Sequence, residues 1–249
     1  MIRTRVLFAM IAGTVLGGCH APRRVYPSAA LPVGFSGFVE TFQQRASDSG
    51  GTITLAVRVT GDSLVSILRG VYDTLVVQHI VAIFDTGRLR LRELRDSVPS
   101  RLEVLRYSVD RLHGTVIVQN RRDGLDTFHL SLHTDSATVD RRILLTSVRW
   151  LPLETGKTYG ARMFDPHTQT VYPLRISIGP KATMAGPAGR TEAYRVELTT
   201  DPPSWFRRAS YLFPTVLWVR ADSSRRIVRI ERPRLRAVFD LVAEEPAAP

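Results

Sequence analysis

The chain has 249 residues, of which 44% are hydrophobic and 23% charged, so its length suits one large β domain or two small ones and its composition excludes wholesale disorder. The formal net charge is +11, but Lys157 and Lys181 are the only lysines among 34 basic residues, and the arginines alternate along strands instead of clustering. Nucleic-acid binding, which needs a gathered basic patch, is therefore not expected, whereas a solvated basic surface or one that faces anionic lipid headgroups stays open.

The N-terminal residues have the order of an export signal. Arg3 and Arg5 supply the positive end, and 6–16 is an apolar run too short to span a bilayer comfortably. The next positions are Leu16, Gly17, Gly18 and Cys19. This order resembles the lipobox of bacterial lipoproteins, in which small residues let the extended backbone enter the signal peptidase and the thiol accepts diacylglycerol. The resemblance implies removal of 1–18 and lipidation of Cys19; an ordinary secretory signal is the alternative.

Cys19 is the only cysteine, so no disulfide can form within the chain. In the lipoprotein sorting rule an aspartate after the cysteine favours inner-membrane retention. Here that position is His20, which implies the outer membrane, facing the periplasm. The Pro-, Ala- and Arg-rich stretch that continues to residue 33 predicts a flexible tether over 19–33.

Residues 34–243 are expected to form a single β-rich domain and 244–249 a disordered tail. The alternating apolar positions are Ile53, Leu55, Val57 and Val59; Phe128, Leu130 and Leu132; Tyr172, Leu174, Ile176 and Ile178; Tyr194, Val196 and Leu198; and Leu235, Ala237, Phe239 and Leu241. One dry and one wet face is typical of antiparallel sheets, and the Gly- and Asp-containing turns between the runs predict a meander of hairpins. The 75–84 run is apolar on both faces, which indicates a central strand or one covered by a helix.

One segment departs from the alternation. Ile143, Leu144, Val148 and Leu151 follow a helical spacing, and Pro152 ends the pattern. We expect a short amphipathic helix that covers the sheet.

The C-terminal half resembles a family of bacterial envelope proteins. The segments that carry the resemblance are Leu-Glu-Thr-Gly-Lys-Thr-Tyr at 153–159, Phe-Asp-Pro at 164–166, Tyr-Pro-Leu-Arg-Ile at 172–176, Pro-Ala-Gly-Arg-Thr-Glu-Ala-Tyr-Arg-Val at 187–196, Trp-Val-Arg-Ala-Asp at 218–222 and Arg-Arg-Ile-Val-Arg-Ile-Glu at 225–231. Their order is similar to the domain-of-unknown-function family 3108, and the insertion at 202–214 departs from it. The resemblance implies an all-β fold with one or two short helices. Its architecture would be a curved antiparallel sheet or open half-barrel, broadly similar to the lipoprotein carriers LolA and LolB. It brings no catalytic residues.

A curved sheet with a helix against its concave face makes an apolar pocket, the usual form of an acyl-chain site. The candidate lining residues are Tyr172, Tyr194, Trp218 and Phe239, for which a plain core position is the alternative.

Catalytic patterns are sparse in this sequence. Asp85-Thr86-Gly87 resembles the active-site triplet of aspartic proteases, but Arg88 follows it and no second triplet exists, so activity would require a homodimer. The same residues also make an ordinary hairpin turn.

Metal and cofactor sites are not expected. His129 and His133 lie about 13 Å apart if that segment is a strand, too far to share a metal ion. Asp165-Pro166-His167 lacks a serine on a nucleophile elbow, and no glycine-rich phosphate loop is present.

Three functions remain open from the sequence. The first is a non-enzymatic, lipid-anchored envelope module that holds an apolar, acyl-chain-like ligand or a protein partner. The second is a structural scaffold lipoprotein. The third is a dimeric aspartic protease that uses Asp85.

Overall fold

The computed structural model describes residues 31 and 35 and the segments 37–45, 51–72, 75–108, 110–119, 124–134, 138–166, 169–187, 189–200 and 214–246. The expected signal peptide, the lipobox with Cys19 and nearly all of the 19–33 tether lie outside the described residues. So does His167.

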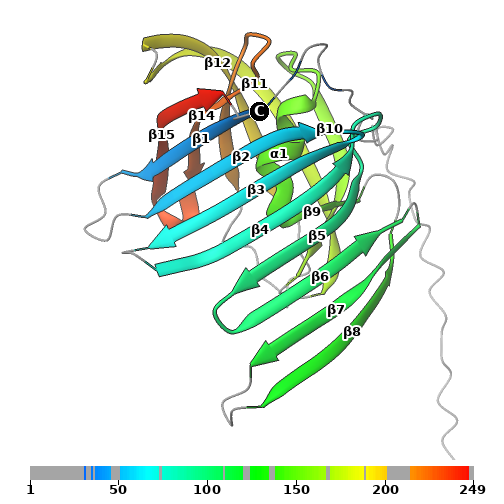
Figure 1. Ribbon diagram of the computed structural model, residues 1–249. Helices are drawn as coiled ribbons and strands as arrows, with labels where there is room; N and C mark the ends of the chain where they lie inside the picture. Colours follow the sequence, from blue (N-terminus) through cyan, green and yellow to red (C-terminus); the bar gives the residue numbers. More distant parts are fainter. Residues whose placement is uncertain are drawn as a thin grey trace, which may run out of the picture.

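Within the described residues the strands form one continuous sheet in the order β8-β7-β6-β5-β4-β3-β2-β1-β15-β14-β13-β12-β11-β10-β9 (Figure 1). The strands are β1 Gly37–Gln44, β2 Thr52–Thr60, β3 Ser63–Tyr72, β4 Leu75–Asp85, β5 Leu91–Val98, β6 Arg101–Tyr107, β7 Arg111–Gln119, β8 Leu125–His133, β9 Thr138–Asp140, β10 Thr158–Asp165, β11 Thr170–Gly186, β12 Gly189–Thr200, β13 Thr215–Arg220, β14 Ile227–Arg232 and β15 Ala237–Pro246. Only the short β9 pairs in parallel, with β10. The predicted fold class, an open antiparallel sheet with little helix, is confirmed.

The hairpins follow from local sequence. In β2, Leu55 and Val57 are fully buried while Arg58 is exposed, which is the predicted alternation. The turn into β3 is tight because Gly61 adopts φ +60°, a conformation that favours glycine, and Thr60 pairs with Ser63 across it. The apolar 75–84 run lies in β4, between β3 and β5, as the central-strand alternative predicted.

The sheet rolls up without closing. Its two ends are β8 and β9, and no hydrogen-bonded pairing joins these two strands in the described chain. Instead, Leu105, Leu112 and Leu130 on the inner face of β6–β8 pack against Phe164 of β10. We call these four residues the overlap seam. One end of the sheet therefore lies over the other and is held there by side chains.

The predicted helix is present at its expected position, in three short pieces. They are the 3-10 turn η1 (Arg141–Ile143), the helix α1 (Leu144–Ser147) and the 3-10 turn η2 (Val148–Trp150). Asp140 caps the segment by accepting a hydrogen bond from the backbone N–H of Arg142. Leu144, Leu145 and Val148 belong to the main core, and α1 lies inside the curve of the sheet (Figure 1).

Three expectations about exposure and order were wrong. The tail is not disordered from residue 244, because β15 continues to Pro246 and pairs with β1. Phe128 is not buried: it is 53% exposed, because β8 is an edge strand with no described strand beyond it. Leu235 is 43% exposed, because it lies in the 3-10 turn η4 (Pro233–Leu235) instead of in a strand.

Candidate functional site

The segment from β9 to η2 carries charged residues into the interior of the rolled sheet. Asp140, Arg142, Thr146 and Arg149 are all buried there. Thr146 shares a buried hydrogen bond of 2.7 Å with Ser66 of β3. The two arginines each bind carboxylates from the sheet, and they do so in two different ways.

Arg142 binds carboxylates from three places. Its Nε and Nη2 donate to Asp140 at 2.9 and 2.7 Å, and its Nη1 donates to Glu103 at 2.8 Å and to Asp96 at 3.0 Å. The hydroxyl of Tyr107 donates to Asp140 as well. We call these five residues the Arg142 cluster. Asp96 and Glu103 face each other across β5 and β6, so the cluster joins the inner face of the overlapping end to the segment beneath it.

The cluster has more acid than its arginine can neutralise. Burial raises the pKa of Glu103, and the nearby charges of Arg142 and Arg101 only partly oppose this. Burial would also raise the pKa of Asp140, but the charge and hydrogen bonds of Arg142 lower the pKa below its ordinary value. Burial and the charge of Asp140 raise the pKa of Tyr107 well above its usual range, so this hydroxyl stays a donor.

Three buried atoms of this region have no hydrogen-bond partner among the described residues. They are Asp96 Oδ1, Glu103 Oε1 and Arg101 Nε. Unpaired buried polar atoms are uncommon in folded proteins and are costly. The Arg142 cluster is therefore a polar region in which some hydrogen-bonding capacity is still unused.

Arg149 makes a matched pair with Glu40 of β1. The two side chains are both 0% exposed, and Nη1 and Nη2 donate to the two carboxylate oxygens at 3.1 and 3.0 Å. The Nε group donates to the carbonyl of Leu145 at 3.2 Å, and the guanidinium lies 4.3 Å from the ring centroid of Phe38. Every charged group of this pair therefore has a partner.

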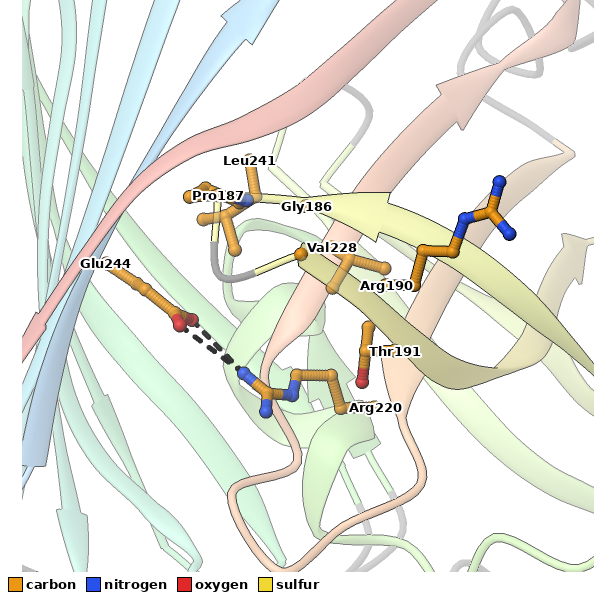
Figure 2. A pocket seen from close by; sticks show the side chains of 9 residues that line it. Gly186, Pro187, Arg190, Thr191, Arg220, Val228, Leu241 and Glu244 are labelled. Carbon is orange, nitrogen blue, oxygen red and sulfur yellow. Dashed lines mark hydrogen bonds and ion pairs between the residues drawn. The ribbon is translucent and has the colours of Figure 1, made fainter.

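A small polar cavity lies beside the β11–β12 hairpin, and its volume is about 60 Å³. Figure 2 shows the carboxylate of Glu244 and the guanidinium of Arg220 pointing toward each other at this cavity, while Arg190 points away from it. Arg226 also pairs with Glu244, at 3.2 Å. Pockets for organic ligands usually have roughly 300–1,000 Å³, so this cavity has the size for water or a small ion.

The structure does not bring the four candidate pocket residues together around this cavity, and none of them lines it. Tyr172 and Phe239 are buried in the main core. Tyr194 is half-buried, with the ammonium group of Lys181 at 5.2 Å from its ring centroid. Trp218 is half-buried and donates from its indole N–H to Glu231 at 2.8 Å.

The residues considered for catalysis lie apart from one another. Asp85 ends β4, and its carboxylate accepts the backbone N–H of Arg88 at 2.6 Å, as a turn aspartate does. His129 and His133 are exposed on the edge strand β8. Asp165 is buried and accepts a hydrogen bond from Arg141 at 3.0 Å. Among the described residues there is no group of three potential metal ligands.

Sequence reasoning missed both buried arginines and their partners, although one signal was available. Glu40 occupies an inward position between Phe38 and Phe42 of the same strand, so the alternation itself marks it as a buried charge. Glu103 likewise lies on the inward face of β6, the same face as Leu105. A charge at a core position requires an opposite charge nearby, and the helical segment supplies it.

No helix of the described chain has the length and apolar character needed to cross a membrane.

Three comparisons with known proteins bear on identity. No curated protein matches the chain in sequence. A crystal structure of a β-barrel-like protein of domain of unknown function DUF1849 from Brucella abortus matches in fold with a TM-score of 0.56 and 9% identity, over 86% of this chain and 99% of that one. The family model for proteins of unknown function DUF3108 matches residues 34–235. The chain therefore belongs to the DUF3108 family.

Proposed function

We propose that this chain is a non-enzymatic, lipid-anchored lipoprotein of the bacterial envelope that holds an amphiphilic ligand with an acyl-type chain. The order Leu16-Gly17-Gly18-Cys19 supports the anchor, and His20 supports delivery to the outer membrane, facing the periplasm. The family and the open sheet are compatible with such a binding module.

The observation that carries the ligand proposal is the overlap seam. The β6–β8 end of the sheet lies on β10 through Leu105, Leu112, Leu130 and Phe164, without a ladder of backbone hydrogen bonds between β8 and β9. Separating the two layers breaks no strand ladder, although it breaks the apolar contacts and the ion pairs of Arg142 with Asp96 and Glu103. The boundary is therefore the place where the rolled sheet can open without loss of backbone pairing. The surfaces so exposed are apolar.

The seam also has a polar border. Tyr107 packs against the seam residues and donates to Asp140 of the Arg142 cluster. An amphiphile that entered here would place its chain against the leucines and its headgroup near Arg142 and Arg101. The unused hydrogen-bonding atoms of Glu103 and Asp96 lie in the same region.

Native mass spectrometry of the mature full chain, after mild extraction, tests the proposal. We expect a co-purifying lipid, or uptake of a fatty-acyl probe that the Leu112→Glu variant loses and the Val242→Glu variant keeps. Leu112 is in the seam, whereas Val242 is 46% exposed on β15. A chain that carries no lipid and takes up no probe would contradict the ligand proposal.

A second candidate is a scaffold that binds an extended strand of another envelope protein. It is favoured by β8, which pairs with β7 over nine residues without a bulge and has no described strand on its other side. Such a free, regular edge is a template for strand addition. Crosslinking in cells from position 128 would give one dominant protein product if the scaffold role is correct, and scattered products if it is not.

A further inference from the structure

The exposed large hydrophobic residues of the described chain are concentrated at one end of the rolled sheet. Six of the eight lie in or beside turns between strands, and they are Tyr72, Leu75, Val77, Leu102, Leu125 and Leu235. We call this group the hairpin rim. Leu75 and Leu125 are 71% and 72% exposed, so their side chains are almost entirely in solvent.

The topology places these turns at the same end. In an antiparallel meander the β3–β4, β5–β6 and β7–β8 turns must share one end of the sheet, and Figure 1 shows the ends of β3, β5 and β7 following one another along its left and lower-left edge. The β14–β15 turn with Leu235 joins them, because β15 begins beside the end of β1: Gln44 pairs with Phe239. The rim is therefore one continuous edge of the molecule.

The opposite end has a different composition. Its turns contain Gly61 and Asp62, the segment 86–90, the described residues Ser108 and Asp110, and the polar stretch 221–226. None of the exposed large hydrophobic residues in the described chain lies in these turns. Exposed leucines are therefore not a general property of the turns of this protein.

The rim also carries positive charge. Arg69 of β3 and Arg236 of the β14–β15 turn are exposed and form no ion pair with another described residue. Arg45, at the end of β1, is 55% exposed and pairs with Asp240. Large apolar side chains next to arginines are the combination that binds the interface of an anionic bilayer.

The chain between β12 and β13 enters and leaves at this same end. Thr200 ends β12, Thr215 begins β13, and Val216 pairs with Glu231 near the β14–β15 turn. The sequence of 201–213 contains Trp205, Phe206, Arg207, Arg208, Tyr211, Leu212 and Phe213. This is the same mixture of residue types, although the proposed surface consists only of the described residues of the hairpin rim.

We propose that the hairpin rim binds the surface of an anionic lipid bilayer, with its leucines inserted at the level of the headgroups and its arginines beside the lipid phosphates. The apolar side chains are distributed over four turns, three of them at the β3–β4 turn, and Arg45, Arg69 and Arg236 lie at the same edge. This distribution fits several shallow insertions into lipid better than one contiguous protein interface. The proposal does not depend on lipidation of Cys19 or on a ligand in the seam.

Hydrogen exchange of the full chain, with and without vesicles, tests this surface. Vesicles of phosphatidylglycerol mixed with phosphatidylcholine should slow amide exchange at the β3–β4, β7–β8 and β14–β15 turns on the order of tenfold. The turns at 61–62 and 108–110 are the internal control and should not change. Vesicles of phosphatidylcholine alone should protect the rim much less, and added salt should weaken the protection.

The variant Leu75→Ser, Leu125→Ser, Leu235→Ser should lose the protection, and the matched Leu→Met variant at the same positions should keep it. Equal unfolding midpoints of the two variants establish that both are folded. Rim protection that is absent, equal for both lipids, or present without vesicles as the protein concentration rises would each overturn the proposal. Because Cys19→Ala removes the anchor and leaves the rim intact, that chain should still show the protection with anionic vesicles.

Discussion

The two buried arginines belong to one short segment, yet their surroundings differ. Arg149 lies in the main core and forms a bidentate pair with Glu40, and every charged group there has a partner. Arg142 lies at the overlap and binds three carboxylates, two of which keep an oxygen without a described partner. A buried pair of equal and opposite charges is a fixed structural element. A buried arginine with surplus acid leaves the covering end of the sheet less firmly held.

The largest expected effect concerns the matched pair. The Arg149→Met variant leaves the carboxylate of Glu40 buried without a partner, which should lower the free energy of unfolding by about 3–5 kcal/mol. Chemical denaturation measures this loss. The double variant Glu40→Leu, Arg149→Met should recover most of it, because no unpaired charge remains. Equal losses for the single and the double variant would show that Arg149 matters mainly through packing.

The Arg142→Met variant should cost less, about 2–3 kcal/mol, because its carboxylates can take up protons and the Asp96 side chain is 14% exposed. The Arg142→Met and Arg149→Met variants should also differ in which strands they destabilise, and for Arg142→Met the effect should be confined to the overlapping end of the sheet. Amide exchange should accelerate in β6–β8 and stay unchanged in β1 and β15. Uniform acceleration over the whole sheet would contradict a specific role of the Arg142 cluster at the overlap.

The Glu103→Gln variant tests the surplus of acid. The pKa of Glu103 is raised in the folded chain, so the folded state binds this proton more tightly than the unfolded state does. The loss of stability caused by the buried, ionised carboxylate of Glu103 is absent below the ordinary pKa of 4.5 and fully present above the raised pKa. The stability of Glu103→Gln relative to the parent should therefore rise as pH increases from about 4 to neutral.

Asp140 makes the opposite contribution. Its folded pKa is lowered, so its stabilising effect is lost as pH falls through that lowered value. Denaturation curves of the parent and of Glu103→Gln over this pH range separate the two groups, since Asp140 acts in both proteins. A pH-independent difference between parent and variant would show that Glu103 is ionised without penalty.

The smallest effect is expected at Asp85, a half-buried turn carboxylate outside both buried sites. The Asp85→Asn variant keeps an oxygen that can accept the N–H of Arg88, so stability should change by less than about 0.5 kcal/mol. Growth and envelope proteolysis of cells that carry the variant should equal those of the parent. Loss of a proteolytic activity would revive the protease interpretation and remove the non-enzymatic proposal.

The fold could be predicted from the sequence further than the site could. Period-two alternation in segments such as 53–59 reports which face of a strand is buried, and the spacing of Ile143, Leu144 and Val148 reports the helical segment. Alternation does not report which strand lies at an edge, so the exposure of Phe128 could not be foreseen. It also gives no information about contacts between Arg142 and Glu103, which are 39 positions apart. Those contacts depend on how the sheet rolls, a property of the whole chain.

The pairing of β1 with β15 has a consequence for how the protein is made. Arg45 and Asp240, which form an ion pair beside these strands, are 195 positions apart. Contacts between such distant positions form slowly, because a large loop must close first. During synthesis, one side of β1 must therefore stay unpaired until nearly all of the described chain has emerged. We expect chaperones to bind this strand in the interval, and a truncation before β15 to leave it permanently exposed to aggregation.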